Sequence, residues 1–284
     1  MSQIQFGWAL NSGPVGEMSP QQYAGAVKQQ IQLVADSIDS LWFIDHVQFA
    51  DNPLLEGWTA LTYLAAQYPQ FQLGHMVLCQ SFRNPALLAK MAATLQYLSE
   101  GRFSFSIGAG WHEEEYRAYG YEFPSARVRV EQLEEALQIV KALWSEKQVT
   151  YQGQYFSVNA AYCEPKPDPI PPIIIGGKGN RMLQLVARYA DEWNAAWLST
   201  EEYQQKSGVL EQECHKIGRD PASVKRSWFG RCVCVATQKE ARELEGNGLL
   251  GTPEQIVEQL QAYIELGVTS FMLGTKILSD TTTV

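Results

Sequence analysis

Two short runs of the chain place a histidine and carboxylates directly after an apolar segment. Asp45-His46 directly follows the apolar run 40–44. After a second apolar run, 103–107, the chain continues with Gly-Ala-Gly at 108–110 and then Trp-His-Glu-Glu-Glu at 111–115. An imidazole titrates near neutral pH, so His46 at such a position can hydrogen-bond a bound ring or move a proton. The structural alternative is that His46 bonds its own neighbour Asp45 and orders the loop.

Two other chemistries use the same types of residue. His112 and Glu115 are three residues apart, as ligands on one helical face would be, but such pairs are common at solvated helix starts. We therefore expect no metal site. Asp45 and Glu114 across a barrel mouth would suit glycoside hydrolysis, in which a retaining enzyme needs its two carboxyl groups about 5 Å apart.

Two glycine pairs also stand at the ends of apolar runs. Gly108 and Gly110 allow the backbone to approach a flat ring closely. Gly176 and Gly177 precede Lys178 and an expected helix, where bare backbone N–H groups can hold a phosphate. This second run lacks the Gly-Lys-Ser/Thr of a nucleotide P-loop, and the chain has no Gly-x-Gly-x-x-Gly fingerprint.

These residues are positioned by apolar, strand-like runs that alternate with helical segments. The expected strands are 5–10, 40–44, 73–78, 103–107, 172–176, 192–196, 229–236 and 270–274. Most of them are apolar on both faces, as in parallel strands that are covered on both sides. Eight such strands with helices between them predict a single (β/α)8 TIM-barrel domain over residues 1–284, with a doubly wound sheet as the alternative.

The segments between the strands carry signals of their own. Ser19-Pro20 and Thr252-Pro253, each with glutamine at the third helical position, predict capped helix starts, and Asn84-Pro85 predicts another. The segment of about 149–172 interrupts the rhythm between the fourth and fifth strands. Its first part resembles a hairpin and its second part is a proline-rich connector, so we expect an insertion there.

The composition excludes some partners and favours a reducing compartment. The chain has 284 residues and a formal net charge of −9, without the Lys/Arg clusters that neutralise a phosphate backbone, which argues against nucleic acid. No apolar stretch approaches the roughly 20 residues that span a membrane, and we expect no signal peptide. The five cysteines are scattered, so we expect reduced thiols in a cytoplasmic protein.

Several of these runs together resemble one known family. The phrases are Ser-Leu-Trp-Phe-Ile-Asp-His at 40–46, Leu-Glu-Gly-Trp-Thr at 55–59, Arg-Asn-Pro-Ala-Leu-Leu-Ala-Lys at 83–90, the run 108–115, and Ile-Gly-Gly at 175–177 followed by 187–194. They resemble the bacterial luciferase-like monooxygenase superfamily, most closely its branch of coenzyme F-420-dependent oxidoreductases. The likeness is strong over residues 6–200 and moderate over 251–274. It implies a TIM barrel that binds coenzyme F-420, a deazaflavin, or alternatively FMN at the carboxyl ends of its strands.

The resemblance also implies roles for the residues of the mouth. It places Asp45 and His46 against the cofactor, with His46 as the catalytic group that handles a proton. Some deazaflavin dehydrogenases use a glutamate as proton donor where this chain has Trp111, so that role does not carry over. We expect Trp111 to line the substrate pocket together with Trp8 and Trp58.

Further cofactor contacts follow from the same resemblance. It implies a cis peptide bond between Met76 and Val77 behind the ring, a polar contact from Glu114, and a phosphate near the Gly-Gly pair and Trp197. The expected cofactor-binding residues are Asp45, His46, Met76, Val77, Gly108, Gly110, Glu114, Gly176, Gly177 and Trp197. Two departures concern the carboxyl-terminal part, which we expect to be shortened. The stretch before Gly251 is short for the family, and little of the chain follows Gly274.

The residues and the resemblance together predict an enzyme. We expect an oxidoreductase that uses reduced coenzyme F-420 or FMN for hydride transfer or monooxygenation of a small organic substrate. The alternative is a non-catalytic flavin-binding barrel or an inactive paralogue. A mouth lined by tryptophans and rimmed by acidic residues favours a neutral or cationic apolar substrate. The resemblance further implies a homodimer formed through barrel helices.

Overall fold

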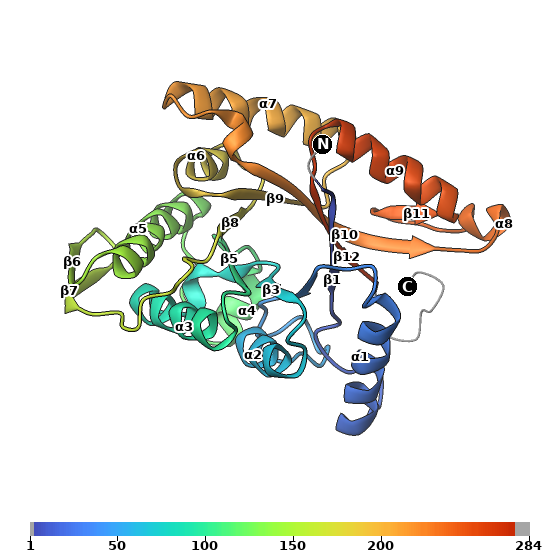
Figure 1. Cartoon of the computed structure of the whole chain (residues 1–284), viewed down its shortest axis with the longest axis horizontal. Coiled ribbons are helices and arrows are strands. Elements are labelled where there is room, and N and C mark those ends of the chain that lie inside the picture. Colours follow the sequence, from blue (N-terminus) through green and yellow to red (C-terminus); the bar gives the residue numbers. More distant parts are fainter. Residues whose placement is uncertain (1–2, 276–284) are drawn as a thin grey trace.

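Eight parallel strands close into a barrel in the computed structural model, which describes residues 3–275 (Figure 1). The barrel strands are β1 (Gln5–Ala9), β2 (Ser40–Phe43), β3 (Gln72–His75), β5 (Phe103–Gly108), β8 (Ile173–Gly176), β9 (Glu192–Ala196), β10 (Lys225–Cys234) and β12 (Ser270–Gly274). Each strand pairs with the next one in this order, and β12 pairs with β1 to complete the ring. The predicted (β/α)8 barrel is confirmed, and the open, doubly wound alternative is wrong.

Helices surround the barrel and connect its strands (Figure 1). The long helices are α1 (Pro20–Val34), α2 (Gly57–Gln67), α3 (Pro85–Leu98), α5 (Ala126–Ser145), α6 (Asn180–Tyr189), α7 (Thr200–Lys216) and α9 (Pro253–Glu265). The short ones are α4 (Glu113–Ala118), α8 (Gln238–Ala241) and the 3-10 turns η1 (Gln80–Phe82) and η2 (Pro221–Ser223). The predicted starts are confirmed. Ser19 and Thr252 form capping boxes, and Asn84 accepts hydrogen bonds from the first backbone N–H groups of α3.

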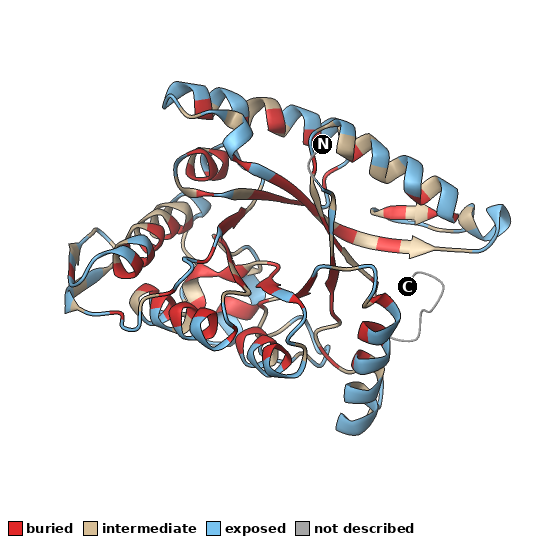
Figure 2. Ribbon diagram, viewed as in Figure 1, coloured by how far each residue is buried: buried red, intermediate tan, exposed pale blue. Residues whose placement is uncertain are grey.

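Side chains of each strand alternate between the barrel interior and the layer under the helices. In the interior, Trp42 packs with Met76, Ile174 and Met272. Gly74 makes room for it, since a Cβ atom there would lie 2.1 Å from the indole ring. The outward positions form the larger core, and Figure 2 shows buried residues along the strands and on the helix faces that cover them.

Three sheet elements differ from the predicted strands. The run 73–78 forms two strands, β3 and β4 (Leu78–Cys79), with the Met76–Val77 bond between them. β10 begins at Lys225, before the expected start, because its polar first residues pair with β9 and β12. A short strand, β11 (Leu249–Gly251), extends the sheet beside the end of β10. Backbone pairing thus continues past the apolar runs that the sequence displays.

The insertion between the fourth and fifth barrel strands begins with a hairpin. β6 (Val149–Gln152) and β7 (Ser157–Ala161) pair antiparallel, and Figure 1 shows them at the outer edge of the molecule, beside α5. Glu135 of α5 accepts backbone hydrogen bonds from Gln154, Tyr155 and Phe156 in the turn, which attaches the hairpin to the helix. Among residues 3–275, no helix is both long and apolar enough to cross a membrane.

Candidate functional site

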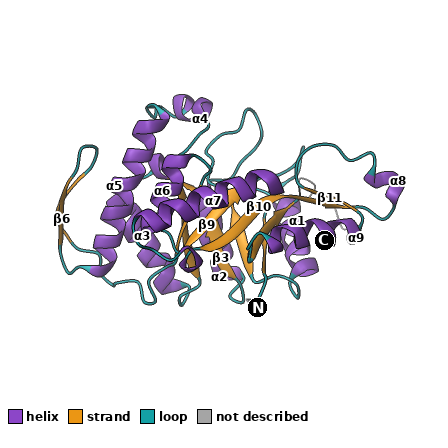
Figure 3. Ribbon diagram, turned by 90° about the horizontal axis from the view of Figure 1, so that it is seen from above, coloured by secondary structure: helices purple, strands orange, loops and turns teal. Residues whose placement is uncertain are grey.

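The carboxyl ends of the barrel strands bring loops from distant parts of the chain to one side of the molecule. β2 leads into Asp45 and His46, β3 into Met76 and Val77, and β5 into the loop that enters α4. Figure 3 shows α4 and the long loops on the side of the barrel opposite the amino terminus. In TIM-barrel enzymes this is the face that carries the chemistry.

Val77 lies between two glycines at this mouth. The peptide bond between Met76 and Val77 is cis, as the resemblance implied. A Cβ atom on Gly108 would lie 2.8 Å from one methyl group of Val77, and a Cβ atom on Gly176 would lie 2.9 Å from the other. Both glycines therefore make room for the Val77 side chain, a reason that the sequence did not reveal. Val77 and Gly176 remain partly exposed at the mouth.

Gly110 makes room for a second buried group. Its φ of 76° suits glycine, and a Cβ atom there would lie 1.9 Å from the hydroxyl oxygen of Tyr116. That hydroxyl lies 2.9 Å from the Cys79 sulfur. Burial raises the pKa of the Cys79 thiol to about 11, so the thiol stays protonated at neutral pH and is a poor nucleophile.

The carboxylate of Asp45 is used inside the protein. Its side chain is 1% exposed and accepts two hydrogen bonds from Arg83, at 2.8 and 2.9 Å, and one from the Cys79 backbone N–H at 2.8 Å. Arg83 also pairs with Glu56, which caps α2. In these contacts Asp45 does not bond His46. Its carboxylate is also not free for glycoside hydrolysis. Its predicted cofactor contact stays a prediction.

His46 is held by Glu115 of α4. Nδ1 of His46 lies 2.8 Å from Oε1 of Glu115, whose side chain is 3% exposed. Oε2 of Glu115 accepts hydrogen bonds from the backbone N–H groups of Val47, at 3.0 Å, and Gln48, at 3.5 Å. The bond joins residues 69 positions apart, so spacing alone could not reveal Glu115 as a site residue. With Nδ1 engaged, Nε2 is the ring nitrogen available to a ligand.

An aromatic cluster of His46, Phe49, Trp111 and His112 stands beside this pair. The His46 ring meets the other three edge-on, with centroid distances of 5.6 to 6.0 Å, and Phe49 stacks on His112 at 4.7 Å. Trp111 is 64% exposed, which leaves its ring available to a ligand. The structure therefore supplies an apolar wall next to the available edge of His46.

The other predicted tryptophans lie in different layers. Trp8 is 4% exposed in the core under the helices, because its neighbours on β1 take the inward positions, so it does not line the mouth. Trp58 is also buried in that core, where it stacks on His75 at 5.4 Å. Trp197 follows β9 at the rim, has a φ of 60° and is partly exposed beside Phe229. Its cofactor contact stays a prediction.

The amino terminus of α6 offers uncapped backbone N–H groups. Its N-cap residue is Gly179, which has no side chain to accept their hydrogen bonds. The N–H of Gly177 instead donates to the Asn194 carbonyl at 3.3 Å within the barrel sheet. Open N–H groups at a helix start attract anions. A phosphate here would therefore meet residues 179–182, beside Lys178, rather than the N–H of Gly177.

Glu114 lies exposed in the first turn of α4, where acidic side chains favour the helix dipole. Its predicted cofactor contact stays a prediction. Within residues 3–275, no three His, Cys, Asp or Glu side chains are grouped as metal ligands would be. His112 and Glu115, the one pair that spacing suggested, have separate partners, since His112 stacks on Phe49 and Glu115 bonds His46.

Comparison with known proteins identifies relatives of the chain. It is 34% identical over 165 residues to an F-420-dependent glucose-6-phosphate dehydrogenase of Kineococcus radiotolerans, a match that covers 57% of this chain and 49% of the relative. The chain thus spans about half the length of the curated relatives that it matches first.

Solved structures share the whole fold at low sequence identity. An F-420-dependent secondary alcohol dehydrogenase in complex with an F-420–acetone adduct superposes with a TM-score of 0.85 at 21% identity, over 99% of this chain and 97% of the other. A riboflavin lyase with modified FMN superposes with a TM-score of 0.81 at 15% identity, over 99% and 88%. The model of the luciferase-like monooxygenase family matches residues 4–245, and this protein belongs to that family.

Proposed function

We propose that this protein is an oxidoreductase that binds a reduced flavin-type coenzyme at the carboxyl-terminal mouth of its barrel. Coenzyme F-420 is favoured because a curated relative and a solved structure of the same fold are named for it, and FMN is the alternative. The observation that carries the proposal is His46, held by a buried carboxylate at the edge of a mouth where Val77 lies between two glycines.

The residues present fit such a coenzyme. The backbone N–H groups at the start of α6 and the ammonium group of Lys178 would hold its phosphate, and the partly exposed Val77 and Gly176 would contact its ring. When bound, the coenzyme supplies the hydride or, with FMN, the activation of oxygen. The protein's part is to orient the reactants, to exclude water and to hold or move a proton at Nε2 of His46.

The mouth favours an uncharged, apolar substrate. The aromatic cluster gives such a substrate a surface to pack against. Two arginines near these loops are engaged within the protein: Arg83 pairs with Asp45, and Arg129 donates to the carbonyls of Gly110 and Pro124. A phosphorylated sugar would find neither of them free, so we propose a small neutral alcohol, ketone or aromatic compound as substrate.

Titration of the purified protein with coenzyme F-420 and with FMN, followed by tryptophan quenching, tests the proposal. We expect F-420 to bind with a Kd of about 1 μM, and Lys178→Ala to weaken binding about tenfold, or 1.4 kcal/mol. Lys216→Ala, an exposed lysine at the end of α7, is the matched control and should bind normally. Binding of neither coenzyme contradicts the proposal, and binding without turnover of any neutral substrate favours the non-catalytic alternative.

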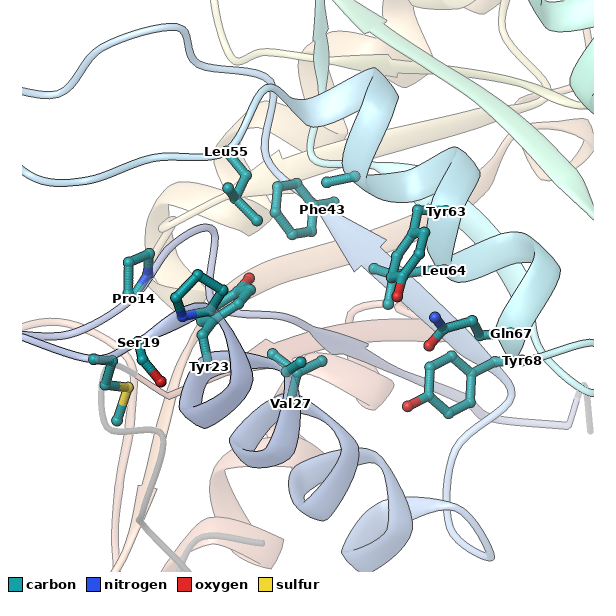
Figure 4. Close-up of a pocket in the computed structure, with 14 residues that line it drawn as sticks. Pro14, Ser19, Tyr23, Val27, Phe43, Leu55, Tyr63, Leu64, Gln67 and Tyr68 are labelled. Carbon is teal, nitrogen blue, oxygen red and sulfur yellow. The ribbon is translucent and has the colours of Figure 1, made fainter.

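We propose that the protein forms a homodimer through the outer faces of α2 and α3. Tyr63 on α2 and Leu87, Tyr97 and Leu98 on α3 are exposed, and Leu98 is 70% exposed. Beside Tyr63, a cavity of about 330 Å³ between α1 and α2 is lined almost entirely by apolar and aromatic side chains (Figure 4). Exposed apolar patches of this kind mark association sites. We propose a second copy of this chain as the partner, because a two-fold dimer brings the same face of both copies together.

A further inference from the structure

We propose that Glu115 is a positioning residue that selects the tautomer of His46. In this tautomer Nδ1 carries the proton and Nε2 presents a lone pair. The catalytic use of that lone pair rests on the proposed function, whereas the tautomer itself is a property of the free protein. The argument depends on which of the surrounding groups can donate and which can accept a hydrogen bond.

Backbone groups determine the role of one carboxylate oxygen. Oε2 of Glu115 faces the N–H groups of Val47 and Gln48, at 3.0 and 3.5 Å. A backbone N–H can only donate, so Oε2 must accept. Glu115 is almost fully buried, so water cannot replace these two hydrogen bonds.

The other carboxylate oxygen determines the role of the ring. Oε1 lies 2.8 Å from Nδ1 of His46, and an ionised carboxylate has no proton to donate. Nδ1 must therefore be the donor, which leaves Nε2 without a proton in the neutral ring. The edge-on contacts with Phe49, Trp111 and His112 restrict rotation of the ring away from this arrangement.

Replacing the carboxylate by an amide should invert the tautomer. The side chain in Glu115→Gln has one acceptor and one donor group. The two backbone donors retain the amide oxygen, so its NH2 group faces Nδ1 of His46, which must then accept. The proton moves to Nε2, and the nitrogen that faces a ligand can no longer take a proton from an alcohol. Loss of a general base at this step typically lowers the rate 100-fold or more.

Nitrogen-15 NMR of the imidazole rings tests the tautomer without any coenzyme or substrate. The chain has four histidines, so one His→Gln variant for each assigns the spectrum. At a pH where the ring is neutral, we expect His46 to carry its proton on Nδ1 in the wild type and on Nε2 in Glu115→Gln. Glu113→Gln is the matched control, since Glu113 is exposed on the same helix and pairs with Arg117, and it should leave His46 unchanged.

A wild-type protein with the proton on Nε2, or a folded Glu115→Gln variant without the exchange, would overturn the assignment. If Glu115→Gln fails to fold, Glu115→Asp retains two acceptors and should keep the wild-type tautomer, and an inverted tautomer there contradicts the proposal. The kinetic readout uses the reverse of ketone reduction, the oxidation of an alcohol by oxidised F-420, because His46 acts as a base in that direction. We expect kcat for this direction to fall about 100-fold, with little change in KM. Failure of F-420 and FMN to bind would remove the proposed function and leave the tautomer result intact.

Discussion

The histidines of this chain differ in what surrounds their rings. His46 has a buried carboxylate on Nδ1, and its side chain keeps 16% of its surface exposed. His75, at the end of β3, is fully buried and stacks on Trp58 with an interplanar angle of 14°. Burial lowers the pKa of His75 to about 4, with the charge of nearby Asp45 opposing the shift. One ring is therefore placed to exchange protons, and the other is kept neutral in the core.

The lowered pKa of His75 predicts a loss of stability in acid. The unfolded chain takes up this proton near the ordinary pKa of 6.5, but the folded protein only near 4. The free energy of unfolding is therefore unaffected by this histidine above pH 6.5. It decreases as the pH falls from 6.5 toward 4, by about 3 kcal/mol in total. Urea unfolding of wild type and His75→Phe at several pH values measures it, and the variant should lose less stability across this window.

His215→Gln is the control for that comparison, because His215 is exposed at the end of α7. It should keep the wild-type dependence on pH. Equal pH dependence in wild type and His75→Phe would show that the buried ring does not control acid stability.

Among the elements of the fold, β2, α2 and α3 are joined by one ion-pair network. Asp45 follows β2, Glu56 caps α2, and Arg83 precedes α3 and pairs with both carboxylates. Burial alone would raise the pKa of Glu56, but hydrogen bonds from Thr59 and Trp58 and the charge of Arg83 lower it. Three of the phrases that carry the family resemblance, 40–46, 55–59 and 83–90, thus meet in this network, which holds the loop that contains His46.

Removing the shared arginine should cost more than removing an exposed one. Arg83→Met leaves the buried carboxylate of Asp45 with the Cys79 N–H alone, and we expect a loss of about 3–5 kcal/mol in the free energy of unfolding. Arg117→Met breaks an exposed pair on α4 and should cost about 0.5 kcal/mol. Urea denaturation of the two variants measures the difference, and equal losses would show that the network contributes nothing beyond a surface pair.

The strands and most helix starts could be predicted because each carries a local signal. Runs that are apolar on both faces predict buried parallel strands. Ser19, Asn84 and Thr252 are N-cap residues that predict the starts of their helices. The site was predictable only in part. His46 follows its strand directly, but Glu115 reaches it through the orientation of α4, a six-residue helix with no apolar period to reveal it.

Orientation within a strand was also beyond the sequence. Where both faces of a strand are apolar, alternation does not show which side chains point into the barrel. Trp8 was expected at the mouth for this reason and lies under the helices, whereas Trp42 on β2 fills the interior. The contacts of Gly108 and Gly176 were hidden as well, because Val77 lies between β3 and β4, far from both glycines along the chain.

For the whole molecule, the proposed homodimer predicts a mass of twice the chain in solution. Leu98→Glu places a charge at the carboxyl-terminal end of the exposed face of α3 and should yield monomers, detected by light scattering after size-exclusion chromatography. Ile217→Glu is the matched control, because Ile217 is exposed at the end of α7, away from this face, and should leave the dimer intact. A monomeric wild type would contradict the proposed interface.

The place of Val77 between Gly108 and Gly176 has a consequence for how such proteins diversify. Gly108 ends β5, Gly176 ends β8 and Val77 lies between β3 and β4, yet the three share one small volume. A larger side chain at either glycine is therefore tolerated only when position 77 shrinks in compensation. Neutral substitutions at positions 77, 108 and 176 should therefore occur together rather than one at a time. A mutagenesis library that randomises the three codons jointly would reach active variants that stepwise substitution cannot.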